Sequence, residues 1–381
     1  MAERTDSVKT MASIRLLRNS PITILVLVVF CIAAITLMLS PSGQDVALAR
    51  TSSAASNPLS PPTSPFRKQL KSKGGKRVPP PVVHYHLNNV TSSSNPLANG
   101  EHILILTPLA RFYQEYWDNL LQLTYPHGLI TLAFIIPKTR EGNTATALLQ
   151  EQITKTQMLG PEKDRFLSIV IERQDFDPPI PSQDEAERHK LENQKVRRAA
   201  MSRARNSLLF TTLGPTTSWV LWLDADVVET PPTLIQDLAA HDKPIVVPNC
   251  FQRYRDSKTQ EMAERPYDFN SWQDSSIAQS LGEKMGPEEI LLEGYAEMAT
   301  YRTLMAYLAD GGSLDKEIPL DGVGGTALFV KAEVHRDGAM FPPFPFYHLI
   351  ETEGFAKMAR RLGWKATGLP NYKVFIYFSN I

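Results

Sequence analysis

The sequence predicts one large α/β domain built on a doubly wound sheet, and three observations lead to this class. Short apolar runs alternate with segments of helical periodicity between residues 102 and 223. The runs are apolar throughout, which is typical of parallel strands covered on both faces. The chain has 381 residues, 43% of them hydrophobic, and is therefore long enough to bury a sizeable core.

The expected elements follow from these patterns in chain order. Strands are predicted at residues 102–107, 129–136, 166–171, 218–223 and 327–331. Helices are predicted at residues 112–123, 144–158, 185–213, 287–309 and 353–362. The sequence contains no internal repeat, and one domain over residues 101–381 fits its length better than two.

The composition excludes several classes of protein. The 40 Lys and Arg residues balance the 40 Asp and Glu residues, which excludes a nucleic-acid binder that works through bulk positive charge. Two cysteines, Cys31 and Cys250, are too few for a disulfide scaffold or a multi-cysteine zinc module. Cys31 lies in an apolar segment, so Cys250 has no partner for an intramolecular disulfide. Cys250 is therefore expected to be a buried small hydrophobe rather than a reactive thiol.

The N-terminal segment predicts a membrane anchor. Residues 21–40 carry no charge and are long enough to cross a bilayer as a helix. The basic residues before them favour a cytoplasmic tail at residues 1–20. A cleaved signal peptide is the alternative, since Ala47 and Ala49 form a small-residue cleavage pattern.

Residues 41–100 predict a flexible stem. They are rich in proline, serine and basic residues and offer few positions for an apolar face. A glycosylation sequon begins at Asn89. A short tail, one span, a stem and a large C-terminal domain form the layout of a single-pass type II membrane protein, which is common among Golgi enzymes.

Two aspartates follow the fourth predicted strand. Asp224 and Asp226 lie two residues apart in extended backbone, which places both on one face at the sheet edge where ligands gather. Two carboxylates there suit one hard divalent cation, which would bridge a diphosphate and neutralise the charge of a leaving nucleoside diphosphate. A solvated turn is one alternative. Another is an aspartyl-phosphate phosphohydrolase with Asp224 as nucleophile, but such enzymes place this strand near the start of their domain.

Five segments of the chain together resemble one family. They are Arg197-Arg198, Ser202-Arg203-Ala204-Arg205-Asn206, Trp222-Leu223-Asp224-Ala225-Asp226, Glu293-Gly294-Tyr295-Ala296-Glu297-Met298 and Leu320-Asp321-Gly322-Val323-Gly324-Gly325-Thr326. The chain resembles the fungal mannan-polymerase family of Golgi α-mannosyltransferases (glycosyltransferase family 62) over roughly residues 100–375. The resemblance implies a GT-A-type doubly wound mixed sheet.

The resemblance also implies an activity and its partners. The donor would be GDP-mannose, the cofactor Mn²⁺ with Mg²⁺ as an alternative, and the acceptor an N-glycan that carries a growing α-1,6-linked mannan backbone. The chain would assemble with homologous subunits at the Golgi membrane, with its catalytic domain in the lumen. Because the donor and the products are both α-linked, configuration is retained. No residue of the sequence is recognisable as a covalent nucleophile. Front-face attack is therefore expected, with the diphosphate assisting deprotonation of the acceptor.

The donor side of the implied site has two parts. Asp224 and Asp226 would bind the metal, and Asp224 would also contact the donor. The family pattern favours Arg197, Arg205 and Asn206 as donor ligands, because arginine forks bind phosphate oxygens bidentately. A basic, solvent-facing helix surface is the alternative.

Further donor and acceptor residues are expected at strand ends and at a helix start. Thr107, Pro108 and Leu109 end the first strand, where this fold seats its nucleotide, although a simple strand-ending turn explains them equally well. In the glycine-rich loop, Asp321 is expected to accept a sugar hydroxyl, with a tight turn as the alternative. Glu351 or Glu353 is expected to orient the acceptor hydroxyl, unless it is a helix-start charge favoured by the macrodipole. The weaker candidates are Asp268, Glu293, Tyr295 and Glu297.

The C-terminal tail departs from the family pattern. Family members carry a histidine shortly after the Asn-Tyr segment, where it completes the metal shell, but residues 371–381 contain no histidine. His348 and water are the candidates for that third position. A non-catalytic scaffold subunit is therefore the alternative to an active enzyme.

Overall fold

The computed structural model describes residues 84–86, 90–174, 190–295 and 297–377. All of them belong to one compact unit, Pro79–Ile381. No helix within these ranges combines the length and the apolar composition that a bilayer crossing requires. The predicted tail, the anchor at 21–40, most of the stem and Asn89 lie outside the described residues.

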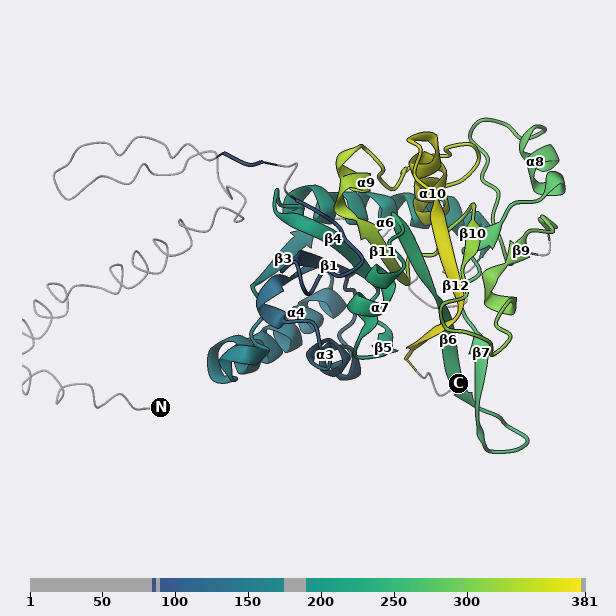
Figure 1. Ribbon diagram of the computed structural model, residues 1–381. Helices are drawn as coiled ribbons and strands as arrows, with labels where there is room; N and C mark the ends of the chain where they lie inside the picture. The colour runs from purple at the N-terminus through teal and green to yellow at the C-terminus, as the bar shows by residue number, and fades with distance from the viewer. Residues whose placement is uncertain (1–83, 87–89, 175–189, 296, 378–381) are drawn as a thin grey trace, which may run out of the picture. The chain divides into compact units, whose positions relative to one another are not determined.

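A mixed sheet of ten strands forms the centre of this unit (Figure 1). In spatial order its main path is β10 (Ile318–Leu320), β12 (Ala366–Ile376), β6 (Ile245–Arg255), β11 (Ala327–Lys331), β4 (Thr217–Leu223), β1 (His102–Pro108), β2 (Ile130–Pro137) and β3 (Ser168–Gln174). Off this path, β5 (Val227–Glu229) pairs with β12, and β7 (Met262–Pro266) pairs with β6. The strands from β4 to β3 pair in parallel, whereas β11 runs antiparallel to both β4 and β6. A separate pair joins β8 (Trp272–Gln273) and β9 (Thr303–Leu304).

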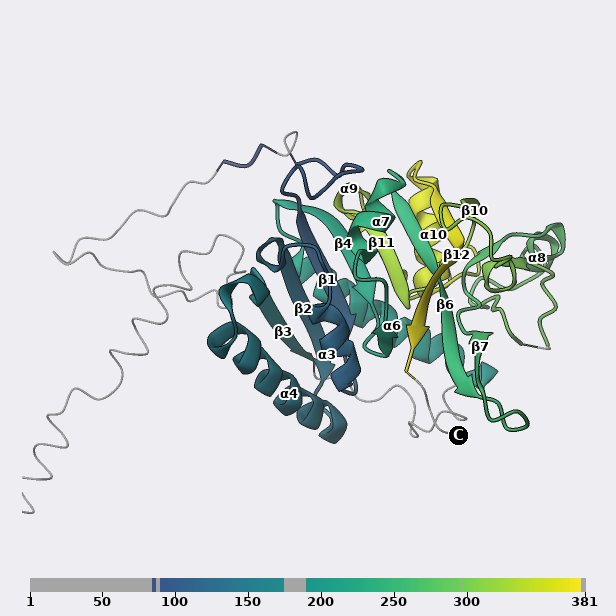
Figure 2. The same cartoon turned by 60° about the horizontal axis from the view of Figure 1, so that its bottom comes forward.

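The sheet is covered on both faces because its strands are apolar on both faces. In β1, Ile103 and Ile105 join one buried cluster, while Leu104 and Leu106 join the other. The first cluster packs against α3 (Gln114–Leu121), α4 (Arg140–Ile153) and α7 (Leu234–Ala240). The second packs against α6 (Leu191–Thr212), α9 (Ala332–Arg336) and α10 (Glu351–Arg361). Figure 2 shows α3 and α4 on one side of the sheet and α6 on the other.

The remaining helices of the described residues are short. They are α8 (Ser276–Gly282), the 3-10 helices His127–Leu129, Glu162–Asp164 and Met305–Tyr307, and the π-helical turn Thr154–Leu159. Ser275 caps α8 by accepting a hydrogen bond from the backbone N–H of Ala278 at 2.9 Å.

The structure confirms the mixed α/β class and most elements of the first half. The helix predicted at 287–309 is wrong: the described residues of this segment form turns, β9 and one 3-10 helix. Its backbone is interrupted by Gly294 (φ 83°) and Tyr301 (φ 53°), both in the left-handed conformation. Strand β6 was not predicted, because Pro248 and a polar C-terminal half mask its apolar start.

A buried histidine links β4 to α9. Nδ1 of His335 lies 2.8 Å from the carbonyl oxygen of Ala339, and Nε1 of Trp222 donates to its Nε2 at 3.3 Å. The ring is therefore neutral, with its proton on Nδ1. Burial lowers the pKa of His335 to about 4, since the charged form has no solvent around it.

We expect this histidine to weaken the fold as the pH falls. Its pKa is lower in the folded state than the usual 6.5, so its stabilising contribution is complete above pH 6.5. That contribution is lost progressively between pH 6.5 and 4, by up to about 3 kcal/mol. Urea unfolding at several pH values measures the loss. His335→Gln should flatten the profile in this window, whereas a change at the exposed His86 should not; the same slope in both variants would contradict this prediction.

Candidate functional site

The two predicted metal ligands lie at the carboxyl end of β4, where the sequence placed them. The backbone N–H of Asp224 donates to the carbonyl oxygen of Thr326 at 2.9 Å, which ties the end of β4 to the glycine-rich loop. The carbonyl oxygen of Asp226 accepts from the backbone N–H of Tyr377 at 2.7 Å. The Asp224 side chain is 28% exposed, so a ligand can reach its carboxylate from solvent.

The buried side chain of Arg205 forms an ion pair with Asp224. Its side chain on α6 is only 2% exposed, and its Nη2 donates to Oδ1 of Asp224 at 2.9 Å. Its Nε donates to Oε1 of Glu351 at 3.3 Å. The guanidinium packs beside the rings of Trp222 and Phe341, at 5.4 and 5.6 Å from their centroids. Because Arg205 is buried, it acts on a ligand through Asp224, which favours a positioning role over the predicted direct contact with the donor.

Neighbouring charges shift the pKa of Asp224 in opposite directions. Burial raises the pKa of Asp224, Arg205 and the more distant Arg197 lower it, and Glu351 raises it. Arg197 is half-buried and close enough to act on this carboxylate, whereas Arg205 has no exposed surface to offer a phosphate. Of the two predicted arginines, Arg197 is therefore the more accessible, and its contact with a diphosphate stays a prediction.

The glycines of the loop 321–326 allow close packing against side chains. A Cβ atom at Gly322 would lie 2.3 Å from the Trp272 ring, and one at Gly324 would lie 1.5 Å from Oδ2 of Asp268. One at Gly325 would lie 2.6 Å from Thr352. The structure therefore gives each of these glycines a packing reason.

Asp268 is the buried carboxylate that packs against this loop. It is buried against Gly324, and its Oδ1 accepts from the backbone N–H of Asn270 at 2.9 Å. Burial raises its pKa to about 6, and the nearby charge of Asp224 adds to this effect. A buried carboxylate with a raised pKa beside the acidic pair is a stronger candidate for a functional residue than the sequence indicated.

Glu351 and Glu353 have different environments although both begin α10. Glu351 remains partly accessible beside Asp224 and Arg205. The Glu353 side chain is 0% exposed, with Oε2 accepting from Arg198 at 2.6 Å and Oε1 accepting from Nε1 of Trp272 at 2.8 Å. Glu351 is thus placed to touch an acceptor, whereas the contacts of Glu353 favour a structural role.

Three other predicted donor residues are buried. The hydroxyl of Thr107 hydrogen-bonds to that of Tyr116 at 2.5 Å, and the Leu109 side chain belongs to the core. Pro108 ends β1 beside them. Asn206 donates to the carbonyl oxygen of Phe341 at 2.7 Å and accepts from its N–H at 3.0 Å. These contacts favour support of the site by Thr107, Leu109 and Asn206, and their predicted contact with the nucleotide stays a prediction.

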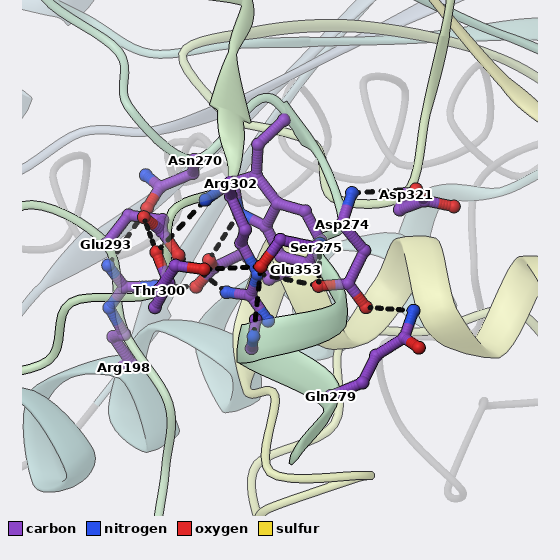
Figure 3. Close-up of polar contacts among 12 residues, drawn as sticks. Arg198, Asn270, Asp274, Ser275, Gln279, Glu293, Thr300, Arg302, Asp321 and Glu353 are labelled. Atoms are coloured by element: carbon purple, nitrogen blue, oxygen red, sulfur yellow. Dashed lines mark hydrogen bonds and ion pairs between the residues drawn. The ribbon is translucent and has the colours of Figure 1, made fainter. Parts of the chain in front are cut away.

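A buried polar network extends from Glu353 away from the acidic pair (Figure 3). Arg302 lies 3.6 Å from the Trp272 ring centroid and donates to Asp274 at 2.9 Å and to Glu293 at 2.7 Å. Glu293 also accepts from the hydroxyl of Thr300 at 2.7 Å. The motif residue Glu293 therefore orients Arg302. The sequence analysis missed Arg302, Trp272 and Arg198, because no local pattern marks the partner of a buried charge.

The network ends at a cleft that Asp321 helps to line. Oδ2 of Asp321 accepts from the backbone N–H of Asp274 at 2.8 Å, and its Oδ1 accepts from Arg360. The cleft has a volume of about 470 Å³. Asp321 is thus reachable by a ligand, and its contact with a sugar hydroxyl stays a prediction.

The described residues contain no group of three His, Cys, Asp or Glu side chains placed to hold a metal ion. His348 lies elsewhere, with Nδ1 3.1 Å from the carbonyl oxygen of Glu289. The end of β12 does reach the acidic pair: Tyr377 bonds to Asp226 and its ring lies 4.8 Å from that of Tyr113. The segment that follows Asn371-Tyr372, which lacks the histidine of the family pattern, therefore passes Asp226.

A mixed α/β sheet with an acidic pair at the end of a central strand defines a candidate nucleotide-sugar site. Residues 81–345 match the Anp1 family model, and the chain belongs to this family. It is 52% identical to "Mannan polymerase complex subunit MNN9" of Candida albicans over 78% of this chain and 80% of that protein. It is 53% identical to "Mannan polymerase complex subunit mnn9" of Schizosaccharomyces pombe over 81% of this chain and 88% of that protein. This match speaks against the phosphohydrolase alternative.

A solved structure of a Pyrobaculum calidifontis mannosyltransferase with GDP-mannose and Mn²⁺ aligns with 72% of this chain and 56% of its own chain. The sequence identity is 13% and the TM-score is 0.38.

Exchanging each glutamate of α10 for glutamine should separate their roles. Glu353→Gln leaves the buried charge of Arg198 without its partner and should lower the free energy of unfolding by about 3 kcal/mol or more. Glu351→Gln leaves Arg205 paired with Asp224 and should cost about 1 kcal/mol. Urea unfolding of both variants measures the difference, and equal losses would refute this assignment.

The packing of Gly324 against Asp268 gives a second test. Gly324→Ala should destabilise the fold by about 1–3 kcal/mol, because the methyl group overlaps the carboxylate. Gly286→Ala is the control, since its nearest neighbour would be 3.6 Å away. The double variant Gly324→Ala/Asp268→Ala should recover part of the loss in a thermal unfolding experiment; no recovery would mean that another contact limits this position.

Proposed function

We propose that the chain is an active mannosyltransferase subunit of a mannan polymerase complex. It transfers mannose from GDP-mannose to the α-1,6-mannan backbone of N-glycans with retention of configuration. The family match and the names of the two relatives support the complex and the sugar. The observation that carries the enzymatic part is the accessible Asp224 carboxylate, which the buried Arg205 fixes beside Glu351.

The donor set fits a divalent cation that keeps open positions. Asp224 and Asp226 would hold Mn²⁺, or Mg²⁺, since cations in phosphate sites are often bound through only one or two carboxylates. The described residues supply no third protein ligand, which agrees with such a site. When bound, the cation neutralises charge on the leaving diphosphate.

The chain's own residues would position the two substrates. Arg197 lies where a cationic fork can bind a phosphate oxygen, and Arg205 keeps Asp224 in place. Glu351 orients the acceptor hydroxyl, and Asp321 accepts a hydrogen bond from another hydroxyl of the sugar. The protein thus contributes orientation and fixed charges, which is what front-face attack without a covalent intermediate requires.

The cellular setting follows the same reasoning. The chain would be a single-pass type II protein of the Golgi membrane, anchored by residues 21–40, with a GT-A-type catalytic domain in the lumen. It would assemble with homologous mannan-polymerase subunits. The uncharged segment 21–40 and the names of the relatives support this setting.

Mannose transfer by the purified full-length chain tests the proposal. With GDP-mannose, Mn²⁺ and an α-1,6-oligomannoside, Asp224→Asn should reduce the rate at least a hundredfold, because a fixed charge at the reacting centre is lost. Asp315→Asn changes an exposed aspartate outside the site and should leave the rate unchanged. Equal rates in the wild-type chain and Asp224→Asn would show that this site is not the source of the activity.

A non-catalytic scaffold subunit is the second candidate. It is favoured by the lack of a histidine in residues 371–381, where the family pattern has one. A full-length chain that neither transfers mannose nor binds GDP with Mn²⁺, but still associates with a homologous subunit, would establish this role instead.

A further inference from the structure

The cleft beside α10 is lined by side chains that the proposed chemistry does not use. Besides Asp321, it is formed by Asp274, Gln279, Tyr347, Lys357 and Arg361. At 1.5 Å per residue, Lys357 and Arg361 lie about 9 and 15 Å along the helix axis from Glu351. Glu351 itself does not line the cleft, but Tyr347 and Leu349 of its lining belong to the loop that leads to Glu351, so a chain of several sugars is the ligand that would occupy both places.

The polar groups of the cleft are balanced between donors and acceptors. Asp321 is paired with Arg360 and Asp274 with Arg302, so both carboxylates are neutralised, yet each retains lone pairs for further hydrogen bonds. Figure 3 shows Asp274 between Asp321 and Gln279. The side-chain amide of Gln279 donates to the carboxylate of Asp274 at 3.5 Å. Lys357 and Arg361 add donors. A polyhydroxylated ligand uses both kinds of group, whereas an anion would use only the cations.

Tyr347 is presented to this cleft by a strained loop. Tyr347, His348 and Glu351 have φ angles of 55°, 62° and 56°. A left-handed backbone is strained at each such residue, and strain of this kind clusters at ligand sites. The loop holds Tyr347 at the cleft, below Lys357 at 5.2 Å and Arg361 at 5.9 Å from the ring centroid. The same loop sets Glu351 against Arg205.

We infer that this cleft is an acceptor subsite, which binds inner sugar residues of an oligomannoside whose terminal residue lies at Glu351 and Asp224. The identity of the sugar rests on the proposed function. The subsite itself rests on the cleft, its balanced hydrogen-bonding groups and the loop that it shares with Glu351. It assigns Tyr347, Lys357 and Arg361 to recognition of acceptor length.

Binding of α-1,6-mannotetraose to the full-length chain, without donor or metal, tests the subsite by calorimetry. Tyr347→Gly should weaken binding about tenfold, because an aromatic contact is lost. It should leave the unfolding midpoint unchanged or raise it, since glycine accepts the left-handed backbone. Tyr301→Gly is the matched control: this tyrosine is also exposed and left-handed, and should show the stability effect without the loss of binding.

Acceptor length provides the kinetic readout. Tyr347→Gly and Lys357→Gln should raise KM for mannotetraose and leave KM for methyl α-mannoside and kcat unchanged, while Lys365→Gln should change neither constant. Unaltered mannotetraose binding in Tyr347→Gly would overturn the subsite, as would tight binding of inorganic phosphate that Lys357→Gln abolishes, because the cleft would then be an anion site. If no transfer occurs but Tyr347→Gly weakens mannotetraose binding, the enzymatic proposal fails and the subsite stands.

Discussion

The site depends on the buried guanidinium of Arg205. One side chain from α6 joins the end of β4 through Asp224 to the start of α10 through Glu351, and two aromatic rings cover it. A charge in such surroundings is tolerated only with partners, so the arginine and the two carboxylates require one another. The consequence is that the chain's own side chains fix the separation between Asp224 and the start of α10.

The parts of the site that the sequence revealed are those governed by local patterns. An apolar strand followed by two aspartates is visible in a single window of residues, and both lie where the pattern placed them. The pairing of Arg198 with Glu353 is not visible, because the two are far apart in the chain and helix periodicity does not tell which arginine is buried. The helix predicted at 287–309 was wrong for a related reason. Buried partners and left-handed residues override the helical periodicity of this segment.

The loop 321–326 shows that a glycine-rich motif can be explained by packing before it is explained by a ligand. Trp272, Asp268 and Thr352 lie where side chains of ordinary residues would be. The loop thereby places Asp321 at the cleft and brings Thr326 to the backbone of Asp224. It is the structural link between the cleft and the acidic pair.

The contact of Tyr377 with Asp226 and Tyr113 joins three distant parts of the chain. Contacts between residues so far apart in sequence form slowly, since a long loop must close before they are made. During synthesis, strands β1 to β4 emerge well before β12, so the acidic pair is formed but remains uncovered on one side until the last strand leaves the ribosome. Assembly of this site is therefore a late event in folding.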